Sequence, residues 1–178
     1  MHLYMGTATG FLADTSSGTI VSKLEGRFFD EFRFHPPESE VRAWSNSLAA
    51  VGEVIDSRGF GTQGVLVEYQ LPLTSRRLDC MFTGHDSSGT HSAVIVELKQ
   101  WSQSRRSDKD AIVWARRGGR AGEREGTHPS YQAWSYAELL RNFNEAVDTE
   151  SVPLRPCAYL HNCLSGDDLN DDFYADYL

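Results

Sequence analysis

Two ionisable residues stand at the end of the most apolar segment of the chain, AVIVELKQW (residues 93–101). Side chains two apart in a strand lie on the same face, so Glu97 and Lys99 are expected to project together. If the preceding strand pairs antiparallel with this one, Asp79 comes close to the same point. Two neighbouring carboxylates repel each other in a poorly solvated site unless a cation lies between them. The pattern therefore predicts a Mg²⁺ site, which could also accept Mn²⁺, with a lysine beside it.

Such a site has a definite chemistry. A metal ion next to a lysine can activate a water molecule, orient a phosphodiester and stabilise charge on the leaving oxygen. The alternative for Glu97 and Lys99 is a surface ion pair at a strand end, which typically stabilises a protein by less than about 1 kcal/mol. Glu68 is expected to be a solvated strand residue.

Three further residues are candidates for the same site. Gln132 and Tyr136 are four apart and share one helix face, although Tyr136 also aligns with Leu140 and could belong to the core. Glu40 lies at the edge of an apolar helix stripe, and its alternative role is a favourable charge in the first helical turn. Glu53 falls well off that stripe.

Hydrophobic periodicity predicts the elements that position these residues. Apolar residues at helical spacing predict a helix over residues 39–55, in which Ser39 can act as the N-cap. Alternation predicts strands near residues 65–71 and 76–83, and the apolar segment 93–99 predicts a central strand. Pro129 opens a second helix that continues to about Val147. A last strand near residues 152–163 completes the order α-β-β-β-α-β, which predicts an α/β protein with a mixed sheet of about four strands flanked by helices.

Length and composition set wider limits. The chain has 178 residues, 40% of them hydrophobic, and a formal net charge of −8. We expect residues 1–35 to dock as an N-terminal extension on one domain over residues 36–178, with "AIVWA" (residues 111–115) as a short strand. The three cysteines lack CxxC spacing and are expected to be free thiols. With neither a membrane span nor a signal peptide in the sequence, we expect a soluble, cytoplasmic protein.

Basic residues gather directly after the apolar segment, although the chain as a whole is acidic. They are Arg105, Arg106, Lys109, Arg116, Arg117, Arg120 and Arg124. A cluster in this position favours contacts with DNA phosphates, which would position a strand without reading its sequence. A solvated loop without a partner is the alternative.

The order and spacing of the candidate site residues resemble the motif of a known family. Asp79 followed by Glu97-Leu98-Lys99 resembles the PD-(D/E)XK nuclease superfamily, and Gln132-Ala-Trp-Ser-Tyr136 is similar to the QxxxY pattern of its RecB-like branch. The resemblance covers roughly residues 39–163 and implies a restriction-endonuclease-like core. It implies Asp79 and Glu97 as metal ligands, helped by the backbone carbonyl of Leu98. Lys99 would orient or deprotonate the attacking water.

The same resemblance gives the remaining candidates their roles. Gln132 and Tyr136 would position nucleic acid or the metal-bound water. Many members of the superfamily add a glutamate from the first core helix, and Glu40 is our candidate for it. The implied activity is that of a Mg²⁺-dependent deoxyribonuclease. The alternative is a catalytically silent module for nucleic-acid binding or assembly.

A narrower resemblance involves LPLTSRRLD (71–79), VIVELKQW (94–101) and HPSYQAWSYAELLRNFN (128–144). These segments resemble the N-terminal region of large bacterial proteins that carry a Schlafen-like superfamily 1 helicase. The resemblance implies a downstream helicase domain or partner subunit. It also implies a role in DNA processing or antiviral defence. The present chain has no GxxxxGK[ST] motif and cannot itself be that motor.

Overall fold

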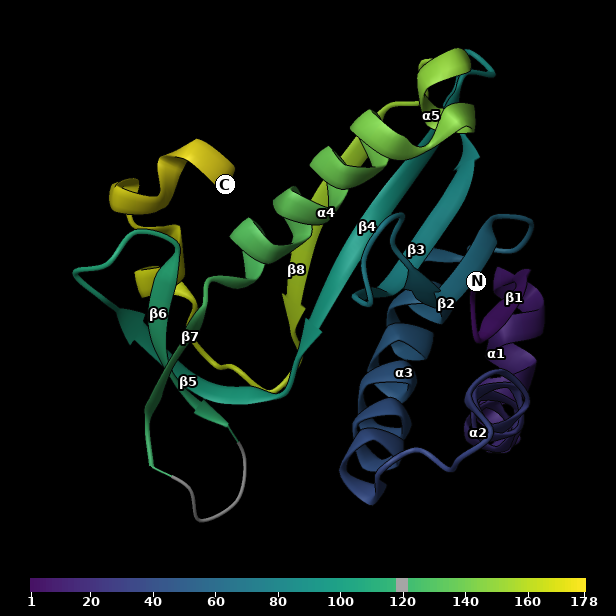
Figure 1. Ribbon diagram of the computed structural model, residues 1–178, viewed down its shortest axis with the longest axis horizontal. Coiled ribbons are helices and arrows are strands. Elements are labelled where there is room, and N and C mark those ends of the chain that lie inside the picture. Colours follow the sequence, from purple (N-terminus) through teal and green to yellow (C-terminus); the bar gives the residue numbers. More distant parts are fainter. Residues whose placement is uncertain (118–121) are drawn as a thin grey trace.

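The computed structural model describes residues 1–117 and 122–178 and has the α/β architecture predicted from the sequence (Figure 1). Its main sheet has five strands in the order β1-β2-β3-β4-β8. They are β1 (Tyr4–Thr7), β2 (Gly64–Gln70), β3 (Arg77–His85), β4 (His91–Lys99) and β8 (Leu154–Leu160). Because β4 and β8 are parallel and the other pairs are antiparallel, the sheet is mixed. The prediction of about four strands was wrong because it lacked β1.

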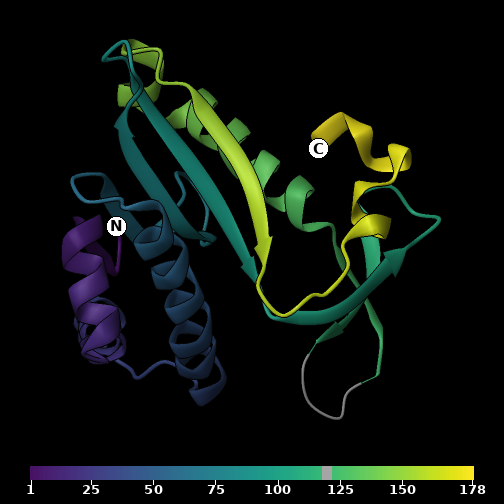
Figure 2. The ribbon, with the colours of Figure 1, turned by 180° about the vertical axis from the view of Figure 1, so that it is seen from behind.

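Helices cover both faces of this sheet. They are α1 (Ala8–Ser16), α2 (Thr19–Phe32), α3 (Glu38–Arg58), α4 (Pro129–Phe143) and α5 (Glu145–Thr149). Helix α4 packs along β4 and β8, and the helices α1–α3 lie on the other side of the sheet (Figures 1 and 2). The core is therefore divided into two hydrophobic clusters with the sheet between them. None of the helices in the described ranges is long and apolar enough to span a membrane.

Helix α3 confirms the predicted amphipathic stripe, since Trp44, Leu48, Val51 and Ile55 are all buried. Its start differs from the prediction. The helix begins at Glu38, so Ser39 lies inside the first turn rather than at the N-cap. It ends at Arg58 and is followed by Gly59 at the C-cap, whose φ of 65° is accessible to glycine at little cost.

Helix α4 begins at Pro129 as predicted, and His128 caps it by accepting a hydrogen bond from the N–H of Ser130. The predicted continuation to about Val147 was wrong. Asn144 has extended backbone angles, ends α4, and caps the short helix α5 with its side chain. The side chain of an asparagine can bond to nearby backbone groups in place of the helical hydrogen bonds, which favours the end of one helix and the start of the next.

Residues 1–35, expected as a docking extension, supply the edge strand β1 and the helices α1 and α2. Strand β1 pairs antiparallel with β2. Phe11, Leu24 and Phe28 are buried in the same hydrophobic cluster as the inner face of α3. This segment therefore contributes directly to the sheet and to one of its cores.

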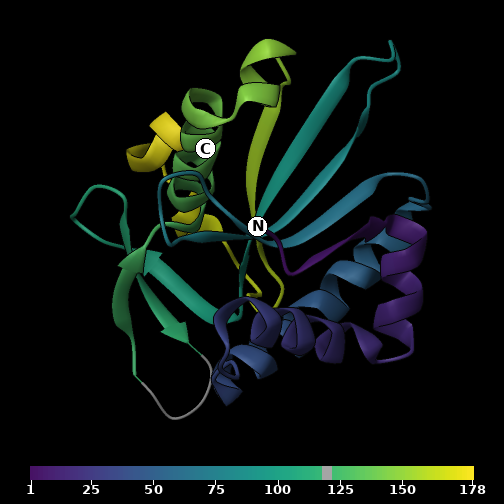
Figure 3. The ribbon, with the colours of Figure 1, turned by 45° about the vertical axis from the view of Figure 1, so that its right-hand side comes forward.

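A second, three-stranded sheet follows the end of β4 after Gln100 (Figure 3). It consists of β5 (Trp101–Arg106), β6 (Ile112–Arg117) and β7 (Arg124–Thr127). Strand β6 confirms the predicted short strand, whereas β5 and β7 were not predicted. Two 3-10 helices, η1 (Asp167–Asn170) and η2 (Asp172–Tyr177), contribute Leu169 and Tyr174 to a core with Trp101 of this sheet. The two sheets are thus joined at the residue that follows Lys99.

Strand β2 changes the face on which its apolar residues lie. Val65 and Val67 join the cluster under α1–α3, whereas Tyr69 and Leu71, which share their parity, join the cluster under α4. Glu68 stands at the change with a φ of 54°, a value uncommon for a residue with a Cβ. The alternation of a regular strand is therefore interrupted at one charged residue, which falls between the pairs Val67–Cys80 and Tyr69–Leu78 in the register of β2 and β3.

Candidate active site

Three residues predicted to share a site lie together at the end of β4. The antiparallel register of β3 and β4 pairs Cys80 with Val96, so Asp79 and Glu97 are the next residues at this end of the two strands. The backbone N–H of Leu98 donates to Oδ2 of Asp79 at 2.7 Å, and Nζ of Lys99 lies 2.5 Å from Oε1 of Glu97. The sheet geometry that predicted this meeting is therefore present.

The Glu97 carboxylate is buried with half of its hydrogen-bonding capacity unused. The residue is 2% exposed, and its Oε2 atom has no hydrogen-bond partner among the residues that the structure describes. Burial raises the pKa of Glu97, while the nearby Lys99 ammonium and the Asp79 carboxyl group act in the opposite direction. A buried charged oxygen without a partner is costly, and a further positive group beside it would reduce that cost.

Asp79 experiences the same conflict more strongly. Burial of its carboxyl group raises its pKa well above the usual range, and the negative charges of Glu97 and Glu68 act in the same direction. Lys99 and the Leu98 N–H oppose this rise. Repulsion between neighbouring carboxylates is the feature from which the sequence predicted a cation.

Gln132 and Tyr136 of α4 extend the site on the other side of Lys99. The Gln132 Oε1 atom accepts from Nζ of Lys99 at 3.2 Å, and its Nε2 atom donates to the Tyr136 hydroxyl at 2.8 Å. Tyr136 is 5% exposed and its ring packs in the cluster under α4. Burial and the nearby Glu97 raise its pKa. Tyr136 therefore belongs both to the core and to the polar chain that ends at Lys99.

Glu40 lies beside the site but is bound to another partner. Its carboxylate pairs with Arg77, which also pairs with Oε2 of Glu68 at 2.6 Å. Burial raises the pKa of Glu40, and the Arg77 charge counters this. Glu40 is thus one of two carboxylates that share a single guanidinium next to Asp79.

The expectation that Glu68 is a solvated strand residue was wrong. Glu68 is buried, and its Oε1 atom accepts from Nε1 of Trp44 at 2.9 Å. Its left-handed backbone places its side chain on the α3 side of the sheet, together with Val67. Alternation along β2 could not indicate this, because the alternation itself breaks at Glu68.

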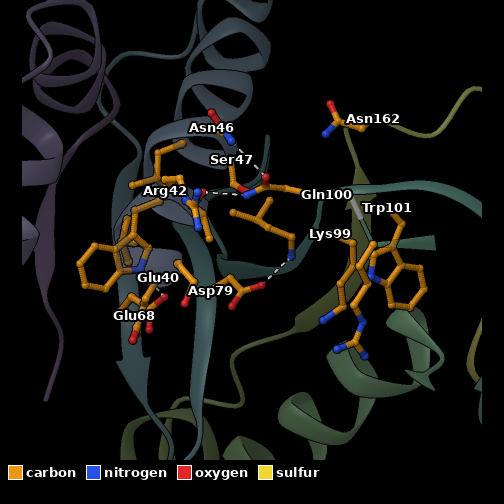
Figure 4. Close-up of a pocket in the computed structure, with 17 residues that line it drawn as sticks. Glu40, Arg42, Asn46, Ser47, Glu68, Asp79, Lys99, Gln100, Trp101 and Asn162 are labelled. Atoms are coloured by element: carbon orange, nitrogen blue, oxygen red, sulfur yellow. Dashed lines mark hydrogen bonds between the residues drawn. The ribbon is translucent and has the colours of Figure 1, made fainter. Parts of the chain in front are cut away.

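A cavity of about 800 Å³ opens between α3 and the junction of the two sheets (Figure 4). Asp79, Glu68 and Lys99 line it. Glu97 is not part of this lining, in keeping with its near-complete burial. The cavity volume lies within the usual range for ligand sites, about 300–1,000 Å³.

One wall of the cavity is held in place by Gln100, which directly follows Lys99. Its Nε2 atom donates to the carbonyl of Ala43 and to Oγ of Ser47, each at 3.1 Å, and its Oε1 atom accepts from Asn46 at 3.1 Å. These bonds join the end of β4 to α3, as Figure 4 shows. Sequence analysis gave Gln100 no role, since a single polar residue after a strand has no distinctive pattern.

The residues at the end of β4 fit a divalent cation in part. The unpartnered Glu97 oxygen and the raised pKa values of both carboxyl groups are features that a bound cation would relieve. Across residues 1–117 and 122–178, however, no set of three His, Cys, Asp or Glu side chains converges as a metal cluster. A Mg²⁺ ion would therefore have two carboxylate ligands and several waters, a common arrangement for this ion.

The predicted phosphate-binding cluster has two parts. Arg105 pairs with Glu123, Arg106 with Asp171, and Lys109 with Glu125, in contacts of 2.9, 3.5 and 2.7 Å. By contrast, Arg116 and Arg117 at the end of β6 have no ion pair in the described part of the chain, and Arg117 lines the cavity. Arg120 falls outside the described residues.

Comparisons with protein-family models, with curated proteins and with solved structures find no match to this chain. The fold is therefore described by its own topology, an α/β protein with a mixed five-stranded sheet. What the site does must be argued from its residues.

Proposed function

We propose that this protein is a metal-dependent nuclease of the PD-(D/E)XK type, with a restriction-endonuclease-like core, that hydrolyses phosphodiester bonds in DNA. The observation that supports this best is the buried Glu97 at the end of an interior strand, with one carboxylate oxygen unpartnered, Lys99 bound to the other, and the half-buried Asp79 beside it. An ordinary surface ion pair would involve neither the burial of Glu97 nor a second carboxylate beside it.

The residues of the chain divide the chemistry among them. Mg²⁺ or Mn²⁺ bound by Asp79 and Glu97, with the Leu98 carbonyl, would supply Lewis acidity for the attacking water and the phosphate. Lys99 would orient that water and stabilise the charge that develops on the phosphate oxygens. Gln132 accepts from the Lys99 amine and is itself bonded to Tyr136, so the rigid α4 controls where the amine lies.

Glu40 is less suited to a direct metal contact than Asp79, because Arg77 already binds it. We propose that Glu40 and Glu68 act through Arg77, which fixes the charge next to Asp79. The wider setting, a downstream helicase domain or partner subunit and a role in DNA processing or antiviral defence, rests on the sequence resemblance alone.

The test compares the wild type with Glu97→Gln on labelled single- and double-stranded DNA, in Mg²⁺, Mn²⁺ or EDTA. Glutamine keeps the volume of the buried side chain and can still accept from Lys99. A metal contribution of several kcal/mol predicts that cleavage falls by at least about 100-fold. Glu53→Gln, an exposed position of α3 away from the cavity, is the matched control and should cut like the wild type.

Two outcomes would reject the proposal. Equal cutting by wild type and Glu97→Gln would indicate a contaminating nuclease and would remove Glu97 from the site. Tight DNA binding without metal-dependent cutting in any preparation would instead support the silent binding or assembly module.

A further inference from the structure

The cavity beside Asp79 has an acidic floor and few cations. Arg42, Lys99 and Arg117 are the three basic side chains among its described lining residues. Lys99 is bound to Glu97 and Gln132. Neither Arg42 nor Arg117 forms an ion pair in the part of the chain that the structure describes, and both are exposed. Two guanidinium groups are therefore left for an anionic ligand.

These two arginines come from different elements that border the same cavity. Arg42 lies in the second turn of α3, and Figure 4 shows it on the α3 side, across from Trp101 and Asn162. Arg117 ends β6 and pairs across the small sheet with Trp101. Arg42 and Arg117 therefore border the same cavity as Asp79, one from α3 and the other from the small sheet.

The position of Arg117 depends on a small neighbour. A Cβ atom added to Gly126 of β7 would meet an Arg117 guanidinium nitrogen at 3.0 Å and the Trp101 ring at 3.7 Å. The absence of a side chain at Gly126 thus leaves space for the guanidinium beside β7, close to the indole. Arg117 is exposed, and its guanidinium lies beside β7 at one wall of the cavity.

The number of free cations favours one strand over a duplex. A protein that binds duplex DNA with strong salt dependence can neutralise about six to ten phosphates, whereas this cavity offers two unpaired arginines. Among the other basic residues of the small sheet, Arg105, Arg106 and Lys109 are occupied by acidic neighbours. Arg116 and Arg124 have no ion pair in the described part of the chain, but neither lines the cavity. In addition, the two site residues that a phosphate can reach from the cavity, Asp79 and Lys99, are part of its lining.

We propose that Arg42 and Arg117 form a phosphate-binding site at the mouth of the cavity, and that it holds the backbone of a single DNA strand next to the phosphodiester that is cut. The inference rests on the proposed nuclease function for the identity of the strand. Arginine suits this task because its planar fork can donate two hydrogen bonds to one phosphate. The two groups would direct a strand across the cavity towards Asp79 and Lys99.

The experiment measures binding rather than cleavage, so that it does not depend on catalysis. A labelled oligothymidylate is titrated with Glu97→Gln protein in EDTA over a series of NaCl concentrations. Arg42→Ala and Arg117→Ala should each weaken binding by about tenfold and reduce the salt slope by about 0.7. Arg58→Ala removes the same charge from the last turn of α3, about 24 Å along the helix from Arg42, and should bind like the parent.

A second variant tests the geometry without changing any charge. Gly126→Ala should displace the Arg117 guanidinium, whose flexible end can move without disturbing the fold, and should weaken binding by about two- to threefold with the net charge unchanged. Binding by Arg42→Ala and Arg117→Ala equal to that of Arg58→Ala would overturn the site. Tighter binding of a duplex of equal length would overturn the single-strand assignment.

The two proposals fail separately. Metal-dependent cleavage together with unchanged binding in both arginine variants would keep the nuclease and reject this site. Weakened binding in both variants of a protein that cuts no DNA would keep the site and reject the nuclease.

Discussion

At Asp79, the requirements of folding and of metal binding oppose each other. The pKa of this carboxyl group is raised by burial and by Glu97, so the folded chain favours its neutral form. A carboxyl group with a raised pKa contributes stability that is present below the pKa of the unfolded chain and is lost as the pH rises through the folded value. Without metal, the ionised Asp79 therefore destabilises the folded state at neutral and alkaline pH.

This leads to a prediction for Asp79→Asn in EDTA. The asparagine carbonyl can still accept from the Leu98 N–H, but the repulsion of Glu97 is gone. We expect the melting temperature at pH 8 to rise by about 2–4 °C, the shift that about 1 kcal/mol produces in a domain of this size. Thermal unfolding monitored by circular dichroism at pH 5 and pH 8 is the measurement. The gain should be smaller at pH 5, and an equal loss at both pH values would contradict the account.

Among individual residues, the sequence correctly predicted the positions of those whose neighbours are set by regular strand pairing. Asp79, Glu97 and Lys99 meet because antiparallel pairing and a period of two bring them together. Glu68 could not be placed in the same way. Its side chain turns inward because the backbone at this residue is left-handed, and a glutamate in an alternating strand indicates a solvated face.

Among the contacts between elements, the one that joins the end of β4 to α3 has the greatest effect on the position of the site residues. Gln100 makes three hydrogen bonds to α3 immediately after Lys99. Gln100→Ala should lower the free energy of unfolding by about 1–2 kcal/mol. It should lower kcat by about tenfold, the range in which outer residues usually support a metal site. Urea unfolding and single-turnover cleavage measure the two effects.

Asn46→Ala is the control for this prediction, because it removes one of the three hydrogen bonds and leaves the other two intact. Its effect on both quantities should be smaller than that of Gln100→Ala. If Gln100→Ala lowered stability without changing cleavage, Gln100 would be a purely structural residue.

The elements differ in how well their sequences specify them. The sequence predicted α3, β2–β4, α4 and β8. Each of these elements buries one side over enough residues for the spacing of its apolar residues to be recognised. Strands β5 and β7 were not predicted, because one is largely polar and the other has four residues. The edge strand β1 is equally short and acquires its structure by pairing with β2.

The whole molecule depends on contacts between segments far apart in the chain. Tyr174 is 0% exposed, its hydroxyl donates to the carbonyl of Ile112 at 2.7 Å, and it accepts from the N–H of Ser107 at 3.0 Å. The acidic end of the chain thereby closes the core of the small sheet, which includes Trp101 of the cavity wall.

Tyr174→Ala should therefore lower the free energy of unfolding by about 3–5 kcal/mol, the usual cost of removing a buried aromatic ring. Tyr174→Phe keeps the ring and should cost only about 1 kcal/mol. Chemical denaturation of both variants gives the comparison. Equal effects of the two substitutions would show that the hydroxyl, rather than the packed ring, holds the small sheet together.

The cavity also has an optical consequence. Of the four tryptophans in the chain, Trp44 and Trp101 line the cavity. The Trp44 indole donates to the Glu68 carboxylate at 2.9 Å, and the Lys99 ammonium lies 5.8 Å from the centre of the Trp101 ring. Each indole thus lies next to a charge that a bound cation or a strand would alter. Tryptophan emission can therefore report on events in the cavity without an attached dye.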